Sequence, residues 1–345
     1  MLGNWRWPSA QSRLLLKSFQ TGARPHAFLL TGPEGAGKRT LAKIYAAALM
    51  CEAAPQDRPC GKCSACGRAE RGSHPDIAII KPGDDPDSKA RVITVKQARE
   101  ARTALSSKAF EGRHKALIIQ EADRMRPEAQ NALLKTLEEP EAGCVFFLTA
   151  DRRASLLPTV RSRCVWVPVP PLDISLATRV LIERGMDERG AAEAARFTRG
   201  AVGSALRYDG EVAPVAKRVR GALSGVRSFG DVPAAARLIT AVYDEAKDPP
   251  ERAIRANRVF ESMEHVVRDA LERLNAPYTA MDASLNLIER IERASARTLL
   301  SMLDSLAQAR RRSGMFISFA SVIDALIYSW LEDIDHAAGG RDQVP

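Results

Sequence analysis

Residues 32–38 read Gly-Pro-Glu-Gly-Ala-Gly-Lys, which has the residue types and the spacing of a phosphate-binding loop. The segment fits the pattern Gly-x-x-x-x-Gly-Lys, and an apolar run that predicts a buried strand precedes it. Glycines let backbone N–H groups turn toward phosphate oxygens, and the lysine supplies a positive charge. The candidate nucleotide-binding residues of this loop are Gly32, Gly35, Gly37, Lys38, Arg39 and Thr40.

Two positions that hold Mg²⁺ in a hydrolysing site of this kind carry other residues. Arg39 stands where a Ser or Thr hydroxyl ligates the metal, and Thr40 lies one place further on, on a different helix face. After the next apolar strand, Gln120 takes the place of the metal-linked Asp, and Glu121 remains where a residue polarises water. A neutral amide is a poor substitute for a carboxylate at Mg²⁺. The sequence therefore favours a site that no longer hydrolyses nucleotide; the alternative is a working ATPase that tolerates both substitutions.

Four of the six cysteines lie close together, at Cys51, Cys60, Cys63 and Cys66. Clustered thiols in a chain without a secretory signal indicate a metal site before they indicate disulfides. Two overlapping Cys-x-x-Cys spacings in a Gly-rich loop let thiolates converge on one tetrahedral ion, and four sulfurs leave no open position. The pattern predicts a structural zinc site, with an iron–sulfur cluster as the alternative.

These residues must be positioned by a regular framework, and the apolar pattern predicts one. Buried strands alternate with helical patterns over about 165 residues, which favours a parallel sheet with helices on both faces. The strands are expected near 27–30, 76–80, 115–120, 144–149 and 165–169. A proline cluster at 168–171 ends this alternation, and the rest is helical almost throughout, with helices expected at 253–274 and 294–312. The predicted fold class is therefore α/β followed by all-α.

Composition excludes several classes of protein. No apolar run approaches the roughly 18 residues of a membrane span, and the N-terminus lacks the basic-then-apolar layout of a secretory signal. The 51 Lys and Arg against 42 Asp and Glu give a net charge of +9, which permits a polyanionic partner without requiring one. Aromatic residues make up only 6%, which argues against a dedicated single-strand binder. We expect a globular, cytoplasmic protein with no membrane partner.

Three segments together resemble the AAA+ clamp-loader family of bacterial DNA polymerase III. They are Arg-Pro-His-Ala-Phe-Leu-Leu before the loop, Asn-Ala-Leu-Leu-Lys-Thr-Leu-Glu-Glu-Pro after the acidic strand, and Ser-Arg-Cys further on, at 24–30, 131–140 and 162–164. The resemblance is strong over residues 20–170 and rests on layout beyond them. It implies an AAA+ P-loop domain at 1–168 with a zinc insertion at 51–66, a small helical lid at 169–210, a helical collar for oligomerisation at 211–335 and a frayed tail at 336–345.

The resemblance also assigns roles to single residues. Arg163, of Ser-Arg-Cys, would be an arginine finger that acts in trans on the ATP site of a neighbouring subunit, where a guanidinium stabilises the transferring phosphoryl group. Thr149 matches the first sensor position. The second sensor position falls on Gly203, with Arg207 one helical turn later as a possible substitute. Glu121 remains a catalytic candidate that we expect to be silent.

What the resemblance implies overall is a subunit of a hetero-pentameric ring that contains gamma/tau and delta subunits. Such a ring opens the sliding clamp and loads it onto primed DNA during replication. The losses at Arg39 and Gln120 suit a subunit without activity of its own, within the DNA-directed DNA polymerase holoenzyme, that binds ATP or ADP weakly or without Mg²⁺. Two alternatives stay open: an ATP-hydrolysing subunit of gamma/tau type, and a zinc-anchored DNA-binding module with a vestigial P-loop.

Overall fold

The computed structural model describes residues 25–84, 91–106, 109–111, 114–208, 212–274, 285–313 and 317–339. Residues 1–24 of the predicted P-loop domain and residues 340–345 of the predicted tail lie outside this described part. The chain divides into two compact units, residues 1–206 and 207–345. Among the described helices, none combines the length and the apolar composition that crossing a membrane requires.

The first unit is built on a five-stranded parallel sheet in the order β2-β5-β6-β1-β7. Its strands are β1 (Ala27–Thr31), β2 (Ile77–Ile80), β5 (Lys115–Ile119), β6 (Cys144–Ala150) and β7 (Val165–Pro168). Two short strands, β3 (Gly83–Asp84) and β4 (Arg91–Val92), form a separate antiparallel pair. The predicted strands are thus all present, and the sheet is parallel as expected.

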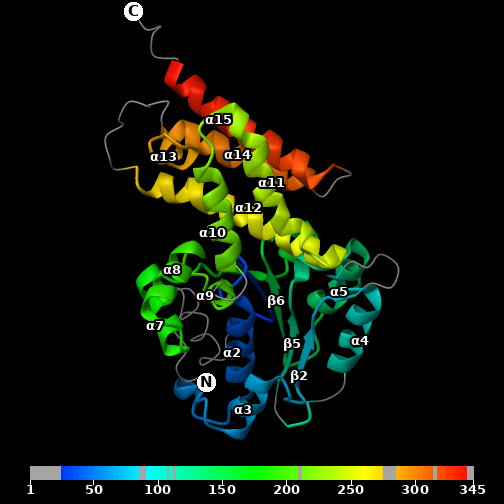
Figure 1. The fold of residues 1–345 in the computed structure, drawn as a ribbon. Helices are drawn as coiled ribbons and strands as arrows, with labels where there is room; N and C mark the ends of the chain where they lie inside the picture. Colours follow the sequence, from blue (N-terminus) through cyan, green and yellow to red (C-terminus); the bar gives the residue numbers. More distant parts are fainter. Residues whose placement is uncertain are drawn as a thin grey trace, which may run out of the picture. The chain divides into compact units, whose positions relative to one another are not determined.

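Helices cover both faces of this sheet (Figure 1). Because side chains alternate along a strand, Phe28 and Leu30 pack with α2 (Lys38–Met50) on one face, and Ala27 and Leu29 pack with α4 and α5 on the other. Helix α4 spans Val95–Ser106 and helix α5 spans Pro127–Glu138. The α/β fold class is therefore confirmed, and both faces of the sheet are buried as parallel sheets require.

Parallel strands place their carboxyl ends at one edge of the sheet, where ligands of such folds bind. The glycine-rich loop follows β1, Glu121 follows β5 and Asp151 follows β6. Shorter elements complete this unit: η2 (Pro55–Asp57), α3 (Ser64–Arg71), η3 (Ala122–Arg124), η4 (Arg153–Ser155), α6 (Pro158–Arg161), α7 (Ile174–Glu183), α8 (Glu188–Phe197) and α9 (Val202–Ala205). The last three helices are those of the predicted lid.

The second unit is helical throughout its described residues. Its elements are α10 (Ala213–Ser224), η6 (Phe229–Asp231), α11 (Val232–Asp244), α12 (Pro249–Glu272), α13 (Leu287–Glu292), α14 (Ala296–Arg312) and α15 (Phe319–Gly339). Trp330 is fully buried at its centre, and its indole N–H donates to the Met302 carbonyl at 3.1 Å. Leu299, Met302 and Leu306 join this core, whereas Leu300 is 54% exposed. The apolar side chains of α14 therefore pack into the core of the second unit.

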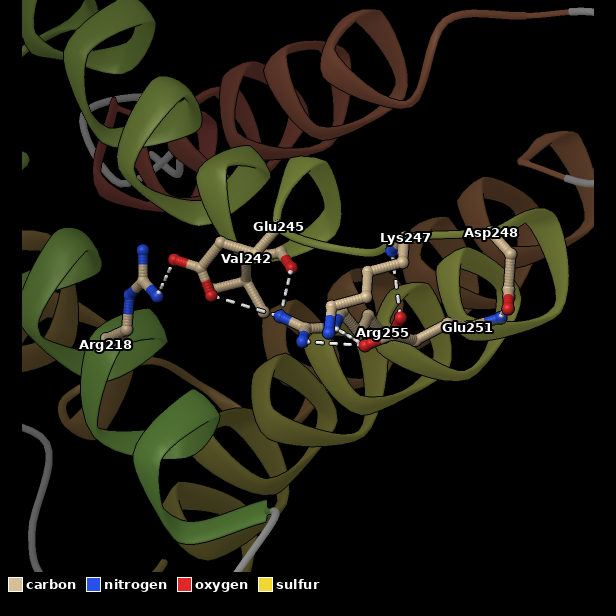
Figure 2. A network of polar contacts seen from close by, with 7 residues as sticks. All are labelled: Arg218, Val242, Glu245, Lys247, Asp248, Glu251 and Arg255. Atoms are coloured by element: carbon tan, nitrogen blue, oxygen red, sulfur yellow. Dashed lines mark hydrogen bonds and ion pairs between the residues drawn. The ribbon is translucent and has the colours of Figure 1, made fainter.

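A chain of ion pairs links α10, the C-terminal end of α11 and α12 in the second unit (Figure 2). Arg255 of α12 donates to Glu251 at 2.8 Å and to Glu245 at 3.0 Å, and Glu245 accepts in turn from Arg218 of α10 at 2.6 Å.

Two helices of the second unit extend beyond their predicted ends. Asp248 caps α12 by accepting from the Glu251 N–H at 2.8 Å, and this helix starts at Pro249, four residues before the predicted 253. Helix α15 likewise continues to Gly339, so residues 336–339 of the predicted frayed tail are helical.

Candidate functional site

The glycine-rich loop leaves β1 and enters α2 with two residues in the left-handed region. Gly35 has φ 78° and Gly37 has φ 95°, conformations that only glycine adopts without strain. Gly37 lies directly before the first residue of α2, so the lysine of the motif opens the helix. The loop therefore has the strand–loop–helix context that the motif requires.

Lys38 is buried, at 8% exposure, and its ammonium group is bound by the chain itself. Its Nζ donates to the carbonyl of Gly32 at 2.6 Å, to the carbonyl of Pro33 at 2.8 Å and to Asp151 Oδ1 at 2.8 Å. A lysine ammonium has three N–H donors, and these three acceptors use all of them. Lys38 must give up at least one of these partners before it can bind a phosphate oxygen.

Asp151 is a residue of this site that the motifs do not reveal. It follows β6, two residues after the predicted first sensor, Thr149, whose hydroxyl accepts the backbone N–H of Glu121 at 3.1 Å. The only sequence signal for Asp151 is an acidic residue directly after a buried strand. Its pairing with Lys38 spans 113 residues of sequence and depends on the sheet order that brings β1 beside β6.

Arginines surround the acidic residue of the candidate site. Glu121 lies 3.8 Å from Arg39 Nη2 through one carboxylate oxygen and 2.9 Å from Arg124 Nε through the other. Arg39 and Thr40 are exposed, and Gln120 bonds through its backbone N–H to the Ile80 carbonyl. The structure thus brings Arg39 and Glu121 together, with a guanidinium beside the carboxylate that the sequence places where a residue polarises water.

Helix α9, in the predicted lid, contacts the loop. The Gly203 N–H donates to the Gly35 carbonyl at 2.9 Å, and Ser204 Oγ donates to the Glu34 carbonyl at 3.2 Å. A Cβ atom at Gly203 would lie 3.0 Å from the Gly35 backbone, so a larger residue at the predicted second sensor position needs the loop to shift. Arg207, the possible substitute, is exposed and falls in the second unit.

Arg163 lies two residues after α6, and its partners come from α5 and α6. Its Nη2 forms an ion pair with Glu138 Oε1, and its Nη1 donates to the Thr159 carbonyl at 2.8 Å. The Arg163 side chain remains 33% exposed. Glu138 belongs to the Asn-Ala-Leu-Leu-Lys-Thr-Leu-Glu-Glu-Pro segment, so two of the three segments that carry the resemblance meet at this ion pair.

The four clustered cysteines converge as their spacing predicts. The sulfur atoms of Cys51, Cys60, Cys63 and Cys66 all lie within 4.8 Å of one another. Cys51 ends α2, Cys63 caps α3 and Cys66 lies in its first turn. Four sulfurs in a compact group are the donor set of a closed structural zinc site. The other two cysteines lie in the sheet domain, Cys144 buried and Cys164 half-buried.

Backbone N–H groups point at these sulfurs. Cys60 Sγ accepts from the N–H of Cys63 at 3.3 Å and from that of Lys62 at 3.5 Å, and these bonds lower the pKa of the Cys60 thiol to about 6. Burial raises the pKa of the Cys51 and Cys66 thiols. Metal binding needs thiolates, so the charge of a bound cation would have to compensate for the cost of deprotonating these buried thiols.

Comparisons with known proteins agree with this framework. Residues 7–173 match the family model described as "DNA polymerase III, delta subunit". Over these residues the chain is similar to the AAA+ clamp-loader family, as the sequence motifs predict. Within the family it is similar to DNA polymerase III subunit delta-prime of Pseudomonas aeruginosa, with 39% identity over 145 residues, 42% of this chain and 43% of that one.

Two further relatives define the range of the similarity. The delta-prime subunit of Haemophilus influenzae is 37% identical over 163 residues, 47% of this chain and 48% of that one. Subunit tau of Bacillus subtilis is also 37% identical, over 154 residues, 45% of this chain and 25% of that one. The chain spans about half the length, or less, of these curated relatives. Sequence identity alone therefore does not distinguish a delta-prime subunit from a tau subunit. The residues of the candidate site have to make that distinction.

Proposed function

We propose that this protein is a delta-prime-like subunit of a bacterial DNA polymerase III clamp loader. In this role its own nucleotide site does not hydrolyse ATP, and Arg163 acts in trans on the ATP site of a gamma/tau-type neighbour. The observation that carries the proposal is the state of Lys38, whose three donors are all bound by the chain's own groups. A working P-loop needs that ammonium group at the nucleotide phosphates.

The chemistry of the loop supports the loss of hydrolysis. Mg²⁺ neutralises charge between the phosphates, and its protein ligands are a hydroxyl and a carboxylate. Arg39 and Gln120 stand at these positions, and neither side chain is a metal ligand of that kind. Arg39 also lies beside Glu121, so an additional cation there would meet a guanidinium. Any ATP or ADP that binds this loop would bind weakly or without Mg²⁺.

The chemistry of Arg163 supports a role in trans. A guanidinium stays charged at all relevant pH values and presents a planar fork to phosphate oxygens. Arg163 keeps a third of its side chain exposed, whereas Lys38 is buried. A partly exposed arginine can reach a nucleotide that a neighbouring chain holds.

The partners follow from the same role. We propose a hetero-pentameric ring with gamma/tau and delta subunits, held together by the helical second unit as a collar and acting on the sliding clamp and primed DNA. The relatives named as delta-prime and tau subunits support a place in such a complex. The four-cysteine group would hold a structural zinc ion, which supports the end of α2 and the start of α3.

The test is reconstitution of clamp loading from purified subunits, with and without this chain, by measuring clamp retained on primed circular DNA. We expect loading only when the chain is present. ATP turnover by the isolated chain with Mg²⁺ would instead favour a gamma/tau-type ATPase. Tight, salt-sensitive DNA binding by the isolated chain would favour a zinc-anchored DNA-binding module.

A further inference from the structure

The ion pair between Glu138 and Arg163 is not explained by stability. Glu138 is 45% exposed and Arg163 is 33% exposed, and ion pairs at such exposure contribute little to folding. The pair also costs the freedom of two long side chains. Its contribution to the free energy of unfolding is therefore small.

The helices that carry the pair are joined to the core and to each other. Glu138 is the last residue of α5. The residue before it, Leu137, is buried at 1% exposure against the sheet. The buried side chain of Gln130 on α5 accepts the N–H of Leu157, the residue that caps α6, at 2.8 Å. A buried side chain of α5 thus holds the start of α6, the helix that leads to Arg163.

Arg163 is held at two points of its guanidinium group. One nitrogen pairs with the Glu138 carboxylate, and the other donates to the Thr159 carbonyl at 2.8 Å and to Ser162 Oγ at 3.4 Å. An unrestrained arginine side chain samples many rotamers, and a misplacement of about 1 Å can reduce a reaction rate about a hundredfold. Two anchors select one orientation before any phosphate is near.

We infer that Glu138 is a positioning residue for Arg163, and that its carboxylate and the Thr159 carbonyl together orient the guanidinium for the phosphate of a neighbouring subunit's nucleotide. This role rests on the proposed function. Glu138 does not touch the nucleotide and acts only through Arg163.

The experiment measures steady-state ATP turnover of the reconstituted loader with clamp and primed DNA, for Glu138→Ala, Glu138→Gln, Glu139→Ala and Arg163→Ala. Glu139 is the matched control, since it is the adjacent exposed glutamate and bonds through its backbone N–H to the Lys135 carbonyl. We expect Glu138→Ala to lower kcat about tenfold at the site that Arg163 serves, with KM unchanged. Glu138→Gln should restore most of this loss because its amide oxygen still accepts, and Glu139→Ala should match the wild type.

The outcomes separate the two proposals. If Arg163→Ala leaves turnover unchanged, the role of Arg163 in trans fails and the role of Glu138 fails with it. If Arg163→Ala lowers turnover while Glu138→Ala behaves like Glu139→Ala, the positioning role alone is overturned. An increase of kcat in both Glu138 variants would also overturn it, because the carboxylate would then restrain the finger.

A second readout uses the isolated full chain. Phenylglyoxal modifies accessible guanidinium groups, and peptide mass spectrometry gives the rate at Arg163. Glu138→Ala should raise this rate several-fold, and Glu139→Ala should not. Equal rates in wild type and Glu138→Ala would show that the carboxylate does not hold Arg163 in solution and would overturn the inference.

Discussion

Lys38 and Arg163 belong to the same compact unit and each pairs with a carboxylate, yet the chain treats the two cations differently. Lys38 is buried, and its three donors are bound by two carbonyls and Asp151. Arg163 is held by Glu138, one carbonyl and the Ser162 hydroxyl, and it keeps a third of its side chain exposed. The identity of a charged residue therefore does not settle its role. What a cation can still bind depends on its burial and on the acceptors it already has.

The largest effect that would test this comparison comes from the cysteine group. Cys51 ends α2, the helix that Lys38 opens, so loss of a metal ligand should loosen the loop side and leave the Arg163 edge intact. We expect Cys63→Ser to lose bound zinc and to lower the free energy of unfolding by several kcal/mol. This is less than the free energy of zinc binding in zinc-finger peptides, which is about 10–16 kcal/mol. Zinc content, thermal unfolding and hydrogen exchange check this, with Cys144→Ser as the control. Equal loss of protection in α2 and α5 would contradict it.

The contact between the lid and the loop should give the next largest effect. A Cβ at Gly35 would lie 2.3 Å from Ser204 Oγ, and its φ of 78° disfavours any other residue. We expect Gly35→Ala to lower the free energy of unfolding by about 2–4 kcal/mol, from overpacking and backbone strain together. Denaturant unfolding measures it, and Gly185→Ala separates the two terms, since Gly185 also has a positive φ but open space around it. Equal losses in both variants would show that the lid does not press on the loop.

A smaller effect should follow from releasing Lys38. Asp151→Ala removes the only anionic acceptor of the three that Lys38 bonds, so the ammonium group should become available to phosphate. We expect tighter binding of a fluorescent ATP analogue, by up to about tenfold, and a loss of about 1 kcal/mol of stability. Titration of wild type and Asp151→Ala by fluorescence anisotropy, with and without Mg²⁺, checks this. Unchanged affinity would mean that Asp151 is not what closes the loop.

The smallest effect should lie in the second unit, outside both regions. Hydrogen bonding from Arg218 lowers the pKa of Glu245, and the N–H of Lys247 together with Arg255 lowers the pKa of Glu251. A carboxyl whose pKa is lowered by folding stabilises the protein above its unfolded pKa, and this contribution fades as pH falls through the folded pKa. Glu245→Gln should therefore flatten the loss of stability below about pH 4.5 only slightly, because the groups are exposed. Thermal unfolding against pH measures it, and a large change would contradict the surface position of the network.

The sequence predicted much of the framework for local reasons. Apolar runs bounded by glycine and proline marked the strands, and the positions of the loop glycines and of the four cysteines follow from spacing alone. The partners of the cations could not be predicted in this way. Asp151 meets Lys38 because β6 pairs with β1, and Glu138 meets Arg163 because α5 packs beside α6. Such contacts depend on tertiary arrangement, which a pattern within one segment does not contain.

The ends of elements were predicted less well than their existence. Helix α12 begins earlier than its apolar pattern because Asp248 and two prolines start it, and α15 runs past the apparent end of its pattern. The lid glycine at 203 was predicted near the nucleotide site and does contact the loop, yet its backbone N–H makes that contact, which no side-chain motif records.

The central claim is that this chain supplies an arginine to a neighbour while its own loop stays silent. The most direct test is ATP turnover by the reconstituted loader with clamp and primed DNA, comparing the wild type with Arg163→Ala and Lys38→Ala in this chain. We predict that Arg163→Ala lowers turnover about a thousandfold or more at the one site it serves, and that Lys38→Ala leaves turnover near the wild-type value. If Lys38→Ala is the damaging change and Arg163→Ala is not, this loop is a working ATPase and the account is wrong.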